Sequence, residues 1–133
     1  MLFFNVDQKK QDKGGASNTV STEWATQTCK LGWAVEGVFP EGCDGTHING
    51  VDRCVENNLI ATGDDYGLVN IYRDPARDNS HAARSFRGHS EHVSRIKFTE
   101  QGRYLLSVGG MDQTVIQWKM TVPKALPNAS QRM

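Results

Sequence analysis

Cysteine is scarce in this sequence, and long apolar runs are missing from it. The 133 residues include three cysteines, Cys29, Cys43 and Cys54, and no two of them lie close together. An odd number without a close pair is poor material for a disulfide framework, so a reducing compartment fits the chain better. No apolar run approaches the ~20 residues of a membrane span, and the short apolar start lacks the features of a signal peptide. We therefore expect a cytoplasmic protein without a membrane segment.

Charge of one sign is not in excess either. Fifteen Lys and Arg residues balance fifteen Asp and Glu residues. A chain without net charge carries no general attraction for nucleic acid or for acidic lipid. We therefore expect protein partners, and neither nucleic acid nor membrane.

Patterns for catalysis and for metal binding are also lacking. The sequence contains no Gly-rich phosphate loop and no nucleophile elbow. Asp64 and Asp65 could form a carboxylate pair, but they stand at an expected turn, without a third acid or a base nearby in sequence. Cys43 and His47 are spaced like metal ligands, but the second pair that a tetrahedral zinc site needs is missing. We expect no enzyme, no metal and no cofactor.

What the sequence does have is an internal repeat. His47-Ile48 recurs as His92-Val93, 45 positions later (92 − 47), whereas residues 59–63 recur as 105–109, 46 positions later (105 − 59). One residue inserted between the two blocks would absorb the difference. Short apolar runs that repeat with a period in the mid-forties indicate stacked β units, and such units usually bind partners rather than catalyse.

The rest of the chain also predicts an all-β protein. Alternating and apolar runs predict strands at residues 2–6, 22–30, 47–54, 58–63, 67–73, 81–86, 92–98, 103–109 and 114–119. Gly, Asn and Asp residues mark the turns between them. Residues 121–133 contain Pro123 and Pro127 and show no apolar pattern, which predicts a disordered tail.

The second unit of the repeat resembles a WD40 blade. Gly88-His89 precedes an apolar strand, a Gly-Gly-x-Asp turn spans residues 109–112, and Trp118 closes the unit. In that family a His, a Ser or Thr, a turn Asp and the Trp form a buried hydrogen-bonded tetrad, which the resemblance places at His89, Val108, Asp112 and Trp118. Because Val108 has no hydroxyl, we expect a partial tetrad of the other three residues.

The first unit departs further from the WD40 pattern. Asp44, Tyr66 and Tyr72 stand at the His, Asp and Trp positions, and only Thr62 keeps the expected type. We expect this degenerate blade to depend on apolar packing instead. The residues concerned are Ile48, Val51, Leu59, Ile60, Val69 and Ile71.

Further motifs narrow the resemblance to echinoderm microtubule-associated-protein-like (EMAP-like) proteins. They are Glu23-Trp24-Ala25-Thr26-Gln27-Thr28-Cys29, Gly37-Val38-Phe39-Pro40, Ala61-Thr62-Gly63-Asp64-Asp65-Tyr66-Gly67 and His89-Ser90-Glu91-His92-Val93-Ser94. The similarity covers residues 1 to about 120. It implies fused β-propellers in a microtubule-associated protein, with tubulin as the expected partner through the parent protein, and a cytoskeletal location at the cilium or the spindle.

The resemblance and the number of strands divide the chain into five parts. Residues 1–31 would be the outer strands of an upstream blade with an exposed loop, and 32–46 an irregular connection. Residues 47–86 would form the degenerate blade, 87–120 a last blade without its outer strand, and 121–133 the tail. We therefore expect an incomplete ring, the C-terminal fragment of a longer protein, whose open edges make the isolated chain self-associate.

Three groups of side chains are candidates for a partner surface. They are Lys9, Lys10 and Lys13; Arg73, Arg77, Arg84 and Arg87; and Trp33 with Phe39. Basic groups could meet acidic tubulin tails, and the arginines are the better candidates because a solvated loop explains the lysines. The two aromatics could anchor a partner, although a plug between blades explains them more simply.

Two functions remain open at this point. The first is a non-catalytic WD40 scaffold of an EMAP-like microtubule-associated protein. The alternative is a WD40 adaptor of a non-cytoskeletal complex, such as a signalling or ubiquitin-ligase subunit. A hydrolase or metal-binding domain is a remote third.

Overall fold

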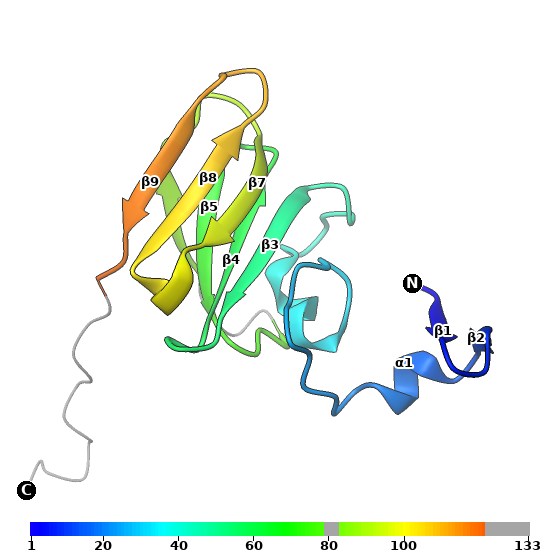
Figure 1. Ribbon diagram of the computed structural model, residues 1–133. Helices are drawn as coiled ribbons and strands as arrows, with labels where there is room; N and C mark the ends of the chain where they lie inside the picture. The colour runs from blue at the N-terminus through cyan, green and yellow to red at the C-terminus, as the bar shows by residue number, and fades with distance from the viewer. Residues whose placement is uncertain (79–82, 122–133) are drawn as a thin grey trace, which may run out of the picture.

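The computed structural model describes residues 1–78 and 83–121, which form nine strands in three antiparallel sheets (Figure 1). β1 (Phe3–Asn5) pairs with β2 (Lys10–Asp12). The second sheet has the order β3 (Ile48–Cys54), β4 (Leu59–Asp64), β5 (Leu68–Arg73) and β6 (Arg84–Arg87). The third has the order β7 (Val93–Phe98), β8 (Tyr104–Gly109) and β9 (Val115–Lys119). The expected class, an all-β fragment of a WD40-type propeller with an incomplete ring, is confirmed.

The strands of the repeat lie where the sequence predicts them. From residue 47 onward, each fully described strand begins and ends within one residue of its expected bounds. The strand expected at 81–86 is represented by β6, and its first two residues lie outside the described part. The expected tail also lies outside it, apart from Thr121.

The two larger sheets pack face to face, with β7 against β3 and β4 (Figure 1). We call this contact the seam; its buried residues are Cys54, Ala61, Val69, Val93, Ile96, Phe98 and Leu105. A Cβ added to Gly63 would lie 2.5 Å from Cγ1 of Val93. The seam therefore needs glycine there, because any side chain would push the sheets apart.

A second core lies on the other face of the β3–β6 sheet, under the 3₁₀ helix η1 (Trp33–Val38). Val35 and Val38 are fully buried there against Ile48, Ile60 and other sheet residues. Ala76 ties the helix to the segment after β5: the Gly37 N–H donates to its carbonyl at 2.8 Å, and its own N–H donates to the Ala34 carbonyl at 2.9 Å. The connection between the N-terminal part and the first blade is thus packed onto that blade.

The N-terminal part differs from the expectation. The prediction of a strand at 22–30 was wrong, because residues 20–32 lie in no helix or strand of the structure. A strand needs a neighbour to hydrogen-bond, and none of the described strands pairs with this segment. The exposed loop expected within residues 1–31 contains β2 and one helical turn, α1 (Gly15–Asn18). The hairpin of β1 and β2 stands apart from the larger sheets (Figure 1). None of the helices in the described residues is long or apolar enough to cross a membrane.

The inserted residue of the repeat lies later than the sequence suggested. Val51 pairs with Thr62 in the first blade and Ile96 with Ser107 in the second, so both strands keep an offset of 45 (96 − 51 and 107 − 62). Tyr72 and Trp118 occupy equivalent places with an offset of 46 (118 − 72). The extra residue is therefore in the β8–β9 turn. Because strand side chains alternate between faces, this one-residue shift changes which residue of β8 points inward.

Candidate functional site

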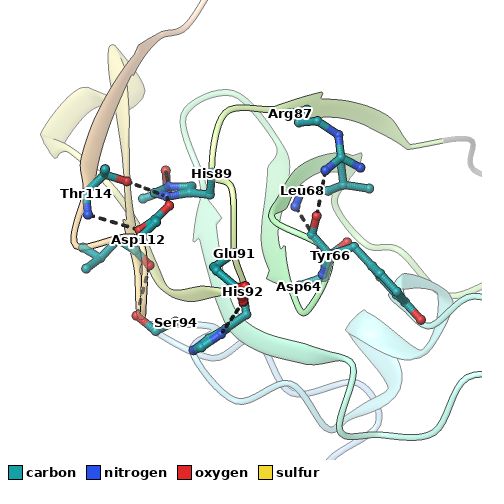
Figure 2. Close-up of polar contacts among 12 residues, drawn as sticks. Asp64, Tyr66, Leu68, Arg87, His89, Glu91, His92, Ser94, Asp112 and Thr114 are labelled. Atoms are coloured by element: carbon teal, nitrogen blue, oxygen red, sulfur yellow. Dashed lines mark hydrogen bonds and ion pairs between the residues drawn. The ribbon is translucent and has the colours of Figure 1, made fainter.

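A chain of hydrogen bonds runs through the interior of the last blade. Trp118 Nε1 on β9 donates to Ser107 Oγ on β8 at 2.8 Å, and Ser107 Oγ lies 2.7 Å from His89 Nε2. The other ring nitrogen, His89 Nδ1, lies 2.8 Å from Asp112 Oδ2 in the β8–β9 turn (Figure 2). His89 is 2% exposed and Ser107 is fully buried. The structure thus brings His89, Asp112 and Trp118 together and adds Ser107.

The donors and acceptors around His89 favour one tautomer of its ring. The Ser107 oxygen accepts the indole N–H, so its own proton is free to go to His89 Nε2. His89 then carries its proton on Nδ1 and donates it to the Asp112 carboxylate. The polar hydrogens of Trp118, Ser107 and His89 then all point toward Asp112, and the Thr114 hydroxyl oxygen, 2.9 Å from His89 Nδ1, is a second acceptor for the His89 proton.

The expected hydroxyl position was wrong by one residue. Val108 points to the opposite face of β8 and is 36% exposed, whereas Ser107 faces the histidine. The physical reason is the position of the inserted residue, since aligning the two units one residue late selects the outward side chain. The tetrad is therefore complete, and the expectation of a partial one is corrected.

Asp112 is held as a carboxylate by its turn as well as by the histidine. Its side chain is 4% exposed, and it accepts a further hydrogen bond from the Thr114 N–H at 3.1 Å. Burial acts to raise the pKa of Asp112, but the hydrogen bonds that it accepts from His89 and Thr114 outweigh it, so the pKa lies below its usual value. The folded blade therefore stabilises the ionised form of Asp112.

The first blade has a different buried polar network, which the sequence did not predict. Ser85 Oγ on β6 donates to Asn70 Oδ1 on β5 at 2.6 Å, and Asn70 Nδ2 donates to Asp64 Oδ2 at 3.0 Å. Asp64 Oδ1 accepts the N–H groups of Tyr66 and Leu68, both at 2.9 Å (Figure 2). The prediction that this blade depends on apolar packing is therefore incomplete, because side-chain hydrogen bonds also join three of its strands.

The residues at the His and Asp positions of the first blade, Asp44 and Tyr66, make other contacts and do not complete a tetrad. Asp44 is exposed in a turn, where its carboxylate accepts the Thr46 N–H at 2.8 Å. Tyr66 is 60% exposed, and its ring stacks on His47 at a centroid distance of 5.8 Å. The Tyr72 hydroxyl donates to the Val38 carbonyl at 3.2 Å and so fastens η1 to β5.

The basic side chains fall into two separate groups. Lys9, Lys10 and Lys13 are exposed on and beside the N-terminal hairpin, which stands apart from the larger sheets (Figure 1). Arg73, Arg84 and Arg87 are exposed on β5 and β6, the outer strands of the first blade. The lysines and the arginines therefore do not form one surface.

Two of the arginines have structural contacts. Arg87 donates from Nη1 to the Tyr66 carbonyl at 3.1 Å (Figure 2). The guanidinium carbon of Arg77 lies 4.0 Å from the centroid of the Trp33 ring, a cation–π distance. Trp33 is half-buried in η1, and the half-buried Phe39 packs against the core beneath that helix. Both aromatics thus contribute to packing on the first blade.

The described residues show no cluster of three or more His, Cys, Asp or Glu side chains that could hold a metal ion. Asp64 and Asp65 diverge: Asp64 is buried in its network, whereas Asp65 is exposed and accepts a hydrogen bond from Asn49 Nδ2 at 2.8 Å. Both acidic side chains thus hold the turn and its neighbouring strand.

The comparisons with known proteins match this fold. A family model described as the second β-propeller of echinoderm microtubule-associated protein matches residues 1–120. A ciliary WD repeat-containing protein, ctxp80 of Euplotoides octocarinatus, is 56% identical over 119 residues, which are 90% of this chain and 16% of that protein. The 77 kDa echinoderm microtubule-associated protein of Lytechinus variegatus is 40% identical over 120 residues, 90% of this chain and 18% of the relative. Human echinoderm microtubule-associated protein-like 4 is 38% identical over 127 residues, 96% of this chain and 13% of the relative.

The chain spans less than a fifth of the length of each of these relatives. The resemblance drawn from the sequence motifs is confirmed by the family match and by these identities. The chain belongs to the echinoderm microtubule-associated protein family and corresponds to part of its second β-propeller.

Proposed function

We propose that this chain is part of a non-catalytic propeller scaffold through which a microtubule-associated protein contacts cytoskeletal partners. The observation that carries the proposal is the family match over residues 1–120. The buried polar side chains also support it, because the His, Asp, Ser and Asn side chains described above form hydrogen bonds with one another. One relative is named as ciliary, which supports a cytoskeletal location, in the cilium or on cytoplasmic microtubules.

Arg73 and Arg84 are the best candidates for a microtubule contact. Both are exposed on the outer strands of the first blade, and no side-chain partner of either is found among the described residues. Arginine on an outer strand can reach acidic tubulin tails, and an exposed contact of this kind weakens as salt increases. Lys9, Lys10 and Lys13 are the competing site on the hairpin.

The test is co-sedimentation of the full-length protein that contains this segment with taxol-stabilised microtubules, at low and at physiological salt. We expect pelleting at low salt, a smaller pelleted fraction in the Arg73→Gln/Arg84→Gln variant, and no change in a matched Lys9→Gln/Lys10→Gln variant. Absence of pelleting at low salt would refute the scaffold proposal and favour the adaptor of a non-cytoskeletal complex. Loss in the lysine variant alone would place the contact on the hairpin.

We also propose that the isolated chain self-associates, and that the strands β1 and β2, within residues 1–31, are outer strands of an upstream blade. Leu2, Phe4 and Val6 are 68%, 65% and 84% exposed on the hairpin, and Val115 on the edge strand β9 is 68% exposed. Exposed apolar strands pair with whatever strand they meet. Analytical ultracentrifugation should show oligomers, and a single monomeric species with a sharp cooperative melt would contradict this.

A further inference from the structure

Among the residues that the structure describes, three side-chain hydrogen bonds join the two blades across the seam, and two of them end on one carboxylate. Asp52 Oδ1 accepts from Lys97 Nζ at 2.9 Å, and Asp52 Oδ2 accepts from the Phe98 N–H at 2.7 Å. The third bond runs from Asn57 Nδ2 to the Gly102 carbonyl at 3.1 Å. Asp52 lies on β3, and its two donors lie on β7, so this carboxylate fastens one blade to the other.

The two sides of the ion pair are exposed to very different degrees. The Asp52 side chain is 3% exposed, whereas the Lys97 side chain is 63% exposed. Within the described part of the chain, Lys97 is the one cation in contact with this carboxylate. A buried carboxylate that loses its cation is strongly unfavourable, whereas an exposed amine is open to reagents and enzymes. The buried Asp52 carboxylate therefore depends on the charge of Lys97, which is exposed at the surface.

We propose that Lys97 is a modification site at which loss of the ammonium charge opens the seam. In an acylation, the deprotonated Nζ attacks the carbonyl carbon of an acyl thioester. A C–N amide bond forms, the C–S bond breaks, and the thiol leaves with the proton that the amine gives up. The product is a neutral amide with one Nζ–H, so Asp52 keeps the backbone N–H of Phe98 but loses the cation that neutralises its charge.

Cys54 reports whether the seam is open. It is 2% exposed among the seam residues, and a Cβ added to Gly102 would lie 2.3 Å from its sulfur atom. Burial raises the pKa of the Cys54 thiol, which slows its reaction further. A soluble thiol reagent therefore reaches Cys54 when the sheets separate. Cys29 is exposed and Cys43 is half-buried, so both are replaced by serine in the test protein.

The experiment measures the rate at which DTNB labels Cys54 in the full chain carrying Cys29→Ser and Cys43→Ser. The variants are Lys97→Gln, Lys97→Arg and the chain with acetyl-lysine incorporated at position 97. Lys119→Gln is the matched control, because Lys119 is an exposed lysine on β9 of the same sheet without a bond to Asp52. We expect labelling roughly 5–30-fold faster for Lys97→Gln and for the acetylated chain. Lys97→Arg and Lys119→Gln should stay within about twofold of the parent.

A second background separates seam opening from a general loss of stability. In Asp52→Asn the buried charge is gone, so Lys97→Gln should add no further increase in labelling. Unchanged labelling of Lys97→Gln in the parent background overturns the proposal, as does an equal increase in Lys97→Arg or Lys119→Gln. A Lys97→Gln effect that persists beside Asp52→Asn also overturns it. The proposal is also overturned if the labelling rate at low urea rises in step with global unfolding instead of staying constant.

Discussion

Replacing Ser107 by alanine is the most informative perturbation of the last blade. The hydroxyl of this fully buried residue accepts the Trp118 N–H and donates to His89 Nε2. Ser107→Ala leaves both partners buried without a hydrogen bond, because the alanine methyl group can neither donate nor accept. An unsatisfied buried polar group costs about 1–3 kcal/mol, and relaxation of the two partners makes their costs less than additive. We therefore expect the free energy of unfolding to fall by about 2–4 kcal/mol.

The control is a change at the neighbouring position. Val108→Thr adds the hydroxyl that the sequence alone placed in the tetrad, but Val108 faces away from His89 and is 36% exposed. We expect its effect to stay within about 0.5 kcal/mol, as for most surface substitutions. The measurement is urea unfolding followed by tryptophan fluorescence at one protein concentration, with the midpoint shifted and the m value unchanged. The reasoning is refuted if Ser107→Ala stays within 0.5 kcal/mol of the parent, or if Val108→Thr is as harmful.

Three further perturbations test other parts of the structure. The pKa of Asp112 is lowered in the folded chain, so its stabilising effect is present above the unfolded value of about 3.9 and is lost as pH falls through the folded value. Urea midpoints measured from pH 6 to pH 3 should therefore fall, and less steeply in Asp112→Asn; equal slopes would contradict the role of its bond to His89. Asn70→Ala should lower the unfolding free energy by about 1–3 kcal/mol, because Asp64 Oδ2 loses its donor; a neutral result in the same assay would show that the first-blade network is dispensable. Gly67→Ala should lower the melting temperature, since Gly67 has a φ of +76° and an added Cβ would lie 2.6 Å from the His89 carbonyl oxygen; an unchanged melt would contradict this close approach.

The strands of the two blades were predictable because their side chains alternate and their turns carry Gly, Asn and Asp. Every fully described strand after residue 47 follows these local signals. The N-terminal segment was not predictable in the same way. Residues 23–31 alternate as a strand does, but pairing depends on a neighbouring strand, and alternation alone does not provide one.

The tetrad shows where sequence reasoning reached its limit. His89, Asp112 and Trp118 could be identified from the family pattern, but the hydroxyl depended on where one inserted residue lies. An insertion in a turn leaves no trace in the apolar pattern, so placing it before β8 or after it was equally compatible with the repeat. The network of Asp64, Asn70 and Ser85 had no family pattern to mark it, because it joins three strands whose register only the fold defines.

The Asp52–Lys97 bond was also invisible in the sequence. The two residues are 45 positions apart and belong to different blades. Their contact depends on the close approach of β3 and β7, which Gly50 and Gly63 permit. Charge pairs across a packed interface depend on tertiary distance, so composition and periodicity could not indicate this one.

The central claim is that the polar residues of the last blade form one directed chain that holds the fold, from Trp118 through Ser107 and His89 to Asp112. The protonation state of His89 tests it most directly. A long-range ¹H–¹⁵N correlation spectrum at neutral pH, assigned with the His89→Gln variant, distinguishes the two ring nitrogens. We predict a proton on Nδ1 and none on Nε2. A proton fixed on Nε2, or rapid averaging between the two nitrogens, would contradict the account.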